Sequence, residues 1–194
     1  IEAMRGCPWS CRFCVAGHIY NPFRKKALQA LEKEIATALS KTKRIGIIGP
    51  SLSDYPGIKE VLKMPEVDFS ITSLRASPKS AELVGLLKGH KSISIAPEAG
   101  TERLRRVINK KITAEDILRT ADLILSEGSP TLRLYFMVGL PTETREDITG
   151  IVNLVKKIKN IISKGNLTLS ISTFVPKPFT PFQWHPMLKK KKKK

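Results

Sequence analysis

The sequence predicts an α/β fold, specifically a partial (β/α)6 TIM-like barrel with parallel strands. Short apolar runs alternate with amphipathic stretches along the 194 residues. Six apolar runs occur, and the segments between them leave room for the helical crossovers that parallel strands require. Six strands are too few to close an eight-stranded barrel, so we expect the barrel to be partial.

The expected strands are short runs rich in aliphatic and aromatic residues. Ile45, Ile47 and Ile48 dominate the second run, and Phe69 and Ile71 alternate with other residues in the third. Runs of this kind are typical of strands buried in a sheet. In chain order, the expected strands are residues 1–5, 44–48, 68–74, 92–96, 132–138 and 167–174.

The expected helices show apolar residues at helical spacing. In the first of them, Leu28, Leu31, Ile35 and Leu39 recur every three or four positions with charged residues between them. The expected helices are residues 25–40, 57–63, 77–88, 101–107, 113–127 and 142–163.

Capping signals fix where several of these helices begin. Ser77 is a good N-cap and Pro78 suits the first helical position. Thr113 is followed three residues later by Asp116, which predicts a weak capping box. The acidic residues up to Asp147 lie near the N-terminus of the last expected helix, where they interact favourably with the positive end of the helix dipole.

Composition and charge indicate one domain and permit an anionic partner. A hydrophobic fraction of 41% is enough for a single core, which we assign to residues 1–188. Net charge is +17, and six of the positive charges form a terminal lysine run, 189–194, expected to be a disordered tail. The remaining basic balance permits RNA as a partner, although a solvated basic surface is the more common reason for such a balance.

The sequence predicts a cytoplasmic protein without a membrane segment. No apolar run approaches the roughly 20 residues needed to cross a bilayer, and the first residues do not resemble a secretory leader. Three clustered cysteines form a poor disulfide framework, which favours a reducing compartment. The chain begins with Ile1 rather than Met, so we expect it to be part of a longer protein.

Three cysteines within eight residues are the most informative local feature. Cys7, Cys11 and Cys14 have the spacing C-x3-C-x2-C and follow the first expected strand. Three thiolates can hold three irons of a cubane cluster and leave the fourth iron open for chemistry. The alternative is a zinc site with His18 as fourth ligand, although zinc ribbons are not built on β/α repeats. In parallel α/β folds, sites form at the carboxyl ends of the strands, where this loop is expected.

This motif, in this position, resembles the radical S-adenosylmethionine (SAM) superfamily. The resemblance extends over nearly the whole chain. Further similarity is to an uncharacterised group of radical SAM proteins often fused to a cobalamin-binding domain. The sequence segments that carry this closer resemblance are residues 12–20, 96–105, 135–144 and 172–184.

The resemblance implies a cofactor set and a reaction. Cys7, Cys11 and Cys14 would bind a [4Fe–4S] cluster, and SAM would chelate the open iron. One electron, from a donor such as flavodoxin or ferredoxin, would cleave SAM to methionine and a 5′-deoxyadenosyl radical that abstracts hydrogen from an unknown substrate. A cobalamin-dependent step such as methyl transfer would require a domain outside this chain.

The resemblance also implies residues that contact SAM. Phe13 would pack near the adenine, although a plain core aromatic is the alternative. Ser51 and Ser53 stand where family members often have a Gly-Gly-Glu turn for the SAM amino group, so this segment departs from the family pattern. The alternative there is a polar turn in which Asp54 caps the next helix.

Further residues of the SAM site are expected at or just after the ends of the fourth and fifth strands. Glu98 would accept hydrogen bonds from the ribose, and Arg103 or Arg105 would hold the methionine carboxylate. Met137 and Gly139 would lie near the adenine, where glycine allows close approach of the backbone. The alternative for the two arginines is that they are solvated charges on a helix. The alternative for Gly139 is that it is a turn glycine before a helix.

Two other functions remain open at this point. Modification of tRNA, such as methylthiolation, fits the basic charge, but methylthiotransferases carry extra cysteines for an auxiliary cluster, and this chain has three in all. A plain iron–sulfur electron-transfer protein would need four ligands and no cofactor pocket.

The proline- and aromatic-rich residues 174–184 cannot form a helix, and they either cap the barrel, line the substrate side or contact a neighbouring domain.

Overall fold

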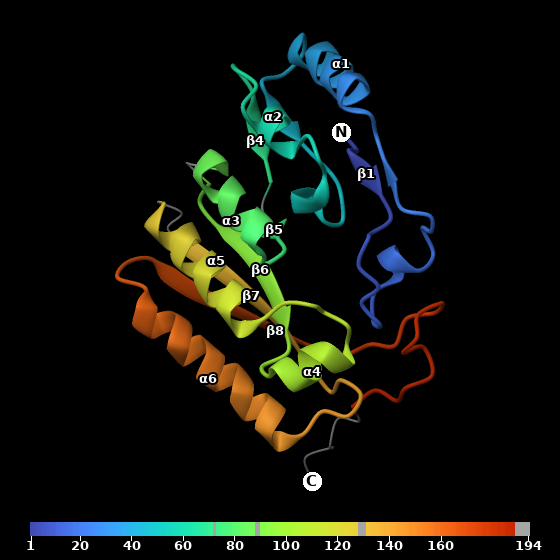
Figure 1. Cartoon of the computed structure of the whole chain (residues 1–194), viewed down its shortest axis with the longest axis vertical. Coiled ribbons are helices and arrows are strands. Elements are labelled where there is room, and N and C mark those ends of the chain that lie inside the picture. Colours follow the sequence, from blue (N-terminus) through green and yellow to red (C-terminus); the bar gives the residue numbers. More distant parts are fainter. Residues whose placement is uncertain (72, 88–89, 128–130, 189–194) are drawn as a thin grey trace.

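The computed structural model describes residues 1–71, 73–87, 90–127 and 131–188, and it has the predicted α/β architecture (Figure 1). The expected lysine tail, 189–194, lies outside the described residues, and the assignment of residues 1–188 to one domain stays a prediction. Within the described ranges, no helix is both long and apolar enough to span a membrane.

The strands form a curved parallel arrangement with one antiparallel addition. The order β5-β6-β7-β8 makes a four-stranded parallel sheet, and β3 pairs with β4 in parallel. The strands are β1 Met4–Arg5, β2 Arg24–Lys25, β3 Arg44–Gly46, β4 Asp68–Ser70, β5 Ser73–Leu74, β6 Ile93–Glu98, β7 Thr131–Val138 and β8 Asn166–Thr173.

The helices occupy the connections between these strands, as the sequence predicts. In Figure 1, α5 and α6 lie over one face of the β6–β8 sheet. The helices are α1 Leu28–Leu39, α2 Ile58–Leu62, α3 Pro78–Val84, α4 Glu102–Val107, α5 Ala114–Ser126 and α6 Arg145–Ile161, with 3-10 turns η1 Val15–Gly17, η2 Leu52–Asp54 and η3 Gly85–Leu87.

The predicted caps are confirmed and explain the helix boundaries. Ser77 accepts a hydrogen bond from the backbone of Ser80, with Pro78 in the first turn of α3. Thr113 and Asp116 form a full capping box at α5. Helix α6 begins at Arg145 rather than at residue 142, because Thr144 is the N-cap and pairs reciprocally with Asp147.

The first strand differs from the prediction in its pairing. Residues near the N-terminus pair in parallel with the segment just after β3, through hydrogen bonds from Ala3 N to Ile48 O (2.9 Å) and from Ile48 N to Ile1 O (2.8 Å). Beyond them, Met4–Arg5 pairs antiparallel with β2, which the sequence did not predict. Strand β2 is two charged residues, so it has no apolar pattern to reveal it.

The expected third strand, residues 68–74, is divided between two neighbours. Its first part, β4, pairs with β3, and its last part, β5, pairs with β6. Residue 72 between them lies outside the described residues. The strand therefore links the two halves of the parallel arrangement.

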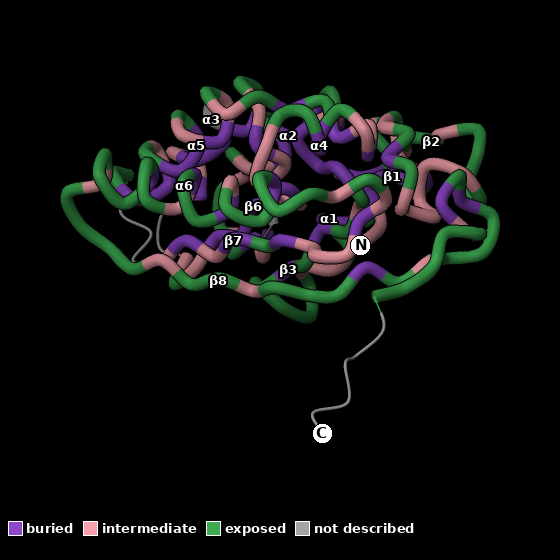
Figure 2. Tube along the Cα trace, turned by 90° about the horizontal axis from the view of Figure 1, so that it is seen from below, coloured by how far each residue is buried: buried purple, intermediate pink, exposed green. Residues whose placement is uncertain are grey.

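The hydrophobic core lies between the sheet and the helices that cover it. Leu132, Leu134 and Phe136 of β7 point toward the helices and are at most 1% exposed. Figure 2 shows the buried trace concentrated along α5, β6 and β7, whereas β8 is mostly exposed. The opposite, concave face of the sheet lies outside this core.

Candidate functional site

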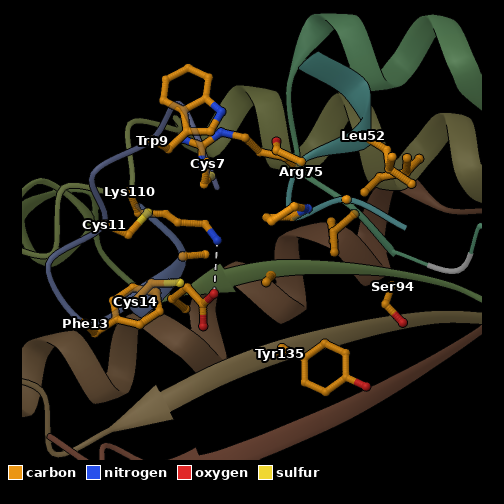
Figure 3. Close-up of a pocket in the computed structure, with 18 residues that line it drawn as sticks. Cys7, Trp9, Cys11, Phe13, Cys14, Leu52, Arg75, Ser94, Lys110 and Tyr135 are labelled. Atoms are coloured by element: carbon orange, nitrogen blue, oxygen red, sulfur yellow. Dashed lines mark hydrogen bonds and ion pairs between the residues drawn. The ribbon is translucent and has the colours of Figure 1, made fainter. Parts of the chain in front are cut away.

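Three free cysteines face one cavity at the carboxyl edge of the parallel strands. Cys7, Cys11 and Cys14 all line this cavity, whose volume is about 250 Å³. Figure 3 shows them on the loop that follows β1, with Lys110 reaching between them. The cavity lies where the parallel strands end, which is the edge at which the sequence predicts a site.

The cysteine loop is folded tightly by its backbone. Gly6 has φ +76°, and a Cβ on it would lie 2.3 Å from the carbonyl oxygen of Tyr20, so only glycine fits without displacement. Within the loop, Cys14 N donates to Cys11 O at 3.0 Å. The turn gathers the thiols on one side.

A second segment, residues 107–112 after α4, docks onto the cysteine loop. Arg12 N donates to Ile108 O at 3.0 Å, and Asn109 Nδ2 donates to Ser10 O at 2.7 Å. Segment 174–184 joins from the other side, since Phe182 N donates to Arg12 O at 3.2 Å. These contacts give the loop a fixed position relative to the sheet.

Trp9, between the first two cysteines, is held by partners from two distant elements. Its Nε1 donates to Asp54 Oδ2 at 2.6 Å, and Ser51 Oγ donates to the same oxygen at 2.7 Å. The Arg75 guanidinium lies 3.9 Å from the centroid of the Trp9 ring and donates to Lys111 O at 3.0 Å. We call Trp9, Asp54 and Arg75 the tryptophan clamp.

Loosening the tryptophan clamp is expected to weaken retention of the cluster. Trp9→Phe keeps an aromatic face for Arg75 but leaves the part-buried Asp54 carboxylate without its indole donor, a loss of about 1–2 kcal/mol. The variant should lose iron to a chelator faster than wild type. Trp184→Phe, at a residue 89% exposed, is the matched control and should behave like wild type. Equal iron loss in all three proteins would contradict a positioning role.

Glu98 and Lys110 form a largely buried ion pair beside the cysteines. Lys110 Nζ lies 3.0 Å from Glu98 Oε1, with the two side chains 11% and 13% exposed. Glu98 ends β6 with φ +66°, a conformation unusual for a residue with a side chain. This backbone turn aims its carboxylate into the cavity, which both residues line.

The cations near the cysteines partly offset the effect of burial on the thiols. Burial raises the pKa of the Cys7 and Cys11 thiols, and the nearby Lys110 and Arg75 cations oppose that rise at Cys11. Cations beside a thiol stabilise its thiolate, which is the form that ligates metals.

The structure brings six of the predicted site residues together. They share the cavity with Arg75, Lys110 and Tyr135. The six are Cys7, Cys11, Cys14, Phe13, Ser51 and Glu98. Ser53 is close in sequence but buried within η2, at 6% exposure.

The two predicted arginines lie elsewhere, engaged with the protein itself. Arg103 donates to Thr142 O at 2.8 Å and pairs with Asp147. Arg105 is 2% exposed and donates to Ala99 O at 2.9 Å and to Ile112 O at 3.2 Å. Arg105 thus ties the turn after β6 to the segment that carries Lys110.

Met137 and Gly139 lie at the end of β7, outside the set that lines this cavity. Gly139 has φ +82°, and its N–H donates to Glu143 Oε2 at 2.6 Å. A Cβ on Gly139 would lie 2.5 Å from the Leu188 side chain, so the close approach required there is to the protein's own chain. Their contact with adenine stays a prediction.

Sequence reasoning missed Trp9, Asp54, Arg75, Lys110 and Tyr135. Asp54 and Arg75 each follow a parallel strand closely, so their positions at the carboxyl edge were a usable signal. Lys110 had no such signal, because it arrives from a loop after α4. Its proximity depends on the docking of residues 107–112.

Cys7, Cys11 and Cys14 line one cavity, and three cysteine thiols are a donor set of the kind that holds an iron–sulfur cluster. His18 directs Nε2 to the carbonyl oxygen of Cys11, at 3.2 Å, rather than completing a zinc set.

A parallel β/α sheet with three cysteine thiols at its carboxyl edge defines an iron–sulfur enzyme core. Residues 1–155 match the Radical SAM superfamily, and the chain belongs to this family. Its members are enzymes, and membership implies a [4Fe–4S] cluster and SAM as cofactors.

Three proteins are similar to the chain in sequence or in fold. An uncharacterised protein of Methanocaldococcus jannaschii is 42% identical, over 94% of this chain and 42% of that protein. A tRNA-2-methylthio-N(6)-dimethylallyladenosine synthase of Sorangium cellulosum is 25% identical, over 81% of this chain and 38% of that protein. The solved structure of OxsB, a cobalamin-dependent SAM radical enzyme with aqua-cobalamin and SAM bound, has a TM-score of 0.62 at 17% identity, covering 86% of this chain and 27% of OxsB. The chain thus spans less than half the length of these relatives.

Proposed function

We propose that the chain is a catalytic core that cleaves SAM reductively and directs the resulting radical to a substrate. The observation that carries this proposal is the single cavity shared by Cys7, Cys11 and Cys14 with Phe13 and Glu98. When bound, the reduced cluster and SAM supply methionine and a 5′-deoxyadenosyl radical that abstracts hydrogen.

The chain's own residues bind, orient and exclude water. The three cysteines hold the cluster, and the tryptophan clamp fixes the loop that carries them. Glu98 is aimed into the cavity by its backbone and is positioned by Lys110, so its free oxygen is available to a ribose hydroxyl. Phe13 supplies an apolar wall on which the adenine packs.

The proposed setting is the cytoplasm, with a small electron carrier such as flavodoxin or ferredoxin as donor. The basis is chemical, since three unpaired cysteines suit a reducing compartment and the reaction consumes one electron for each SAM cleaved. In the complete protein, a cobalamin-binding domain beside this core would make methyl transfer the reaction.

Modification of tRNA is the second candidate, favoured by the similarity to the tRNA methylthio-synthase and by the net charge of +17. Binding of tRNA with a steep salt dependence that survives deletion of residues 189–194 would support it. If the salt dependence of tRNA binding disappears when residues 189–194 are deleted, the electrostatic attraction comes from the lysine tail alone, which would not support this candidate.

The test of the main proposal is product formation. Protein reconstituted anaerobically with iron and sulfide should convert SAM to 5′-deoxyadenosine and methionine in equal amounts when dithionite is added. Protein that carries four irons per chain and yields neither product would contradict the proposal.

A further inference from the structure

The concave face of the sheet beside the cysteine cavity is polar. Parallel barrels ordinarily fill this face with branched apolar side chains. In β7, Leu132, Leu134 and Phe136 point toward the helices, so Arg133 and Tyr135 point the opposite way. Arg133 is half-buried there, and Tyr135 is 38% exposed.

Strand register extends this polar character across three strands. Arg133 pairs with Ser94 of β6 and with Thr168 of β8, and Tyr135 pairs with Ser170. Partners in register in a parallel sheet share a face. We call Ser94, Arg133, Tyr135 and Ser170 the polar strip.

The polar strip is continuous with the cysteine cavity. Ser94 and Tyr135 line the same cavity as Cys11 and Cys14. Figure 3 shows Tyr135 and Ser94 on the sheet, below the cysteine loop. A ligand on the strip would therefore adjoin the site where hydrogen is abstracted.

The polar strip has hydrogen-bonding capacity that the protein leaves unused. Within the described part of the chain, the Arg133 guanidinium and the Ser94, Tyr135 and Ser170 hydroxyls have no hydrogen-bond or ion-pair partner. The carboxylate of Glu98, which lines the cavity, is already paired with Lys110. A guanidinium offers five donors and no acceptor.

We propose that the polar strip binds an anionic group of the substrate, a phosphate or a carboxylate, with Arg133 as its principal contact. This inference rests on the proposed function, which places the substrate beside the cluster. Arg133 would take the anionic oxygens in bidentate fashion, and the hydroxyls of Tyr135 and Ser170 would hydrogen-bond the rest of a polar molecule. An apolar substrate would leave these groups desolvated and unpaired, which disfavours it strongly.

The experiment titrates the whole chain, without SAM, with inorganic phosphate and separately with citrate, observing arginine side-chain Nε–H resonances by NMR. Arg133→Gln identifies the Arg133 resonance by its disappearance. Arg119→Gln, at an exposed arginine of α5, identifies the matched control resonance and should retain wild-type SAM cleavage. We expect a saturable shift of the Arg133 resonance and no saturable shift of the Arg119 resonance.

The two probes separate the possible anions. Tighter saturation by phosphate indicates a phosphorylated substrate, and tighter saturation by citrate indicates a carboxylate. An Arg133 resonance that does not shift, or that shifts like Arg119 without saturation, would overturn the inference. This readout involves no SAM, so it is independent of SAM cleavage. A protein that binds the anion but fails to cleave SAM would refute the proposed function and would still support anion binding by the polar strip.

Discussion

Cys11→Ala is expected to abolish cluster assembly and, with it, all formation of 5′-deoxyadenosine. Cys11 is the most enclosed of the three thiols, at 7% exposure, and lies next to the Lys110 and Arg75 cations. Two remaining cysteines cannot hold a cubane with a single open iron. Iron content and product yield after reconstitution measure the effect, and product formation should fall to the level seen without protein because the open-iron site is lost.

The control for this substitution is Ser10→Ala in the same loop. Ser10 is exposed, and its contact with Asn109 uses the backbone carbonyl, which alanine retains. The control should assemble cluster as wild type does. If Cys11→Ala kept a full complement of iron and its activity, the assignment of the cysteines as ligands would be wrong.

Asp147→Asn is expected to destabilise the fold by about 2 kcal/mol, because it removes a buried charge that several donors share. The Asp147 side chain is 1% exposed and accepts hydrogen bonds from Thr101, Arg103 and Thr144, which tie α4 to the start of α6. Urea unfolding measures the change. Asp122→Asn, at an exposed position of α5, should leave stability nearly unchanged.

The Asp147 contribution should also depend on pH. Burial raises the pKa of Asp147, but hydrogen bonds from Thr101, Thr144 and Arg103 outweigh it, so the pKa lies below its ordinary value of 3.8. A lowered pKa means that the stabilisation is fully present above the ordinary value and is lost as pH falls through the lowered one. The stability difference between wild type and Asp147→Asn should therefore shrink in strong acid. A difference that instead grew in acid would contradict this account.

The order of strands and helices was predictable because it depends on local features of the sequence, namely the spacing of apolar residues and the capping residues. Leu31 and Ile35 are buried at the helical spacing that predicted α1, and the caps at Ser77 and Thr113 form as expected. Strand β2 carries no such pattern, since Arg24 and Lys25 are exposed and pair only because the chain returns from the cysteine loop. Pairings set by tertiary return are not visible in a short window.

Side-chain partners across the fold were the harder part of the site. Arg103 or Arg105 was expected at the methionine carboxylate, yet Arg105 donates to two backbone carbonyls and Arg103 pairs with Asp147. Conversely, Trp9 and Asp54 are 45 residues apart and meet only after the strands align. Sequence position places a residue at the carboxyl edge, but packing decides whether its side chain faces the cavity.

In our proposal, the three cysteines hold a cluster whose fourth iron is open to SAM. Electron paramagnetic resonance of the dithionite-reduced, reconstituted chain tests this arrangement, with spectra recorded before and after SAM is added. We expect a [4Fe–4S]⁺ signal whose line shape changes on addition of SAM. A signal that SAM leaves unchanged would contradict the proposal, because it would show that SAM does not bind at the open iron.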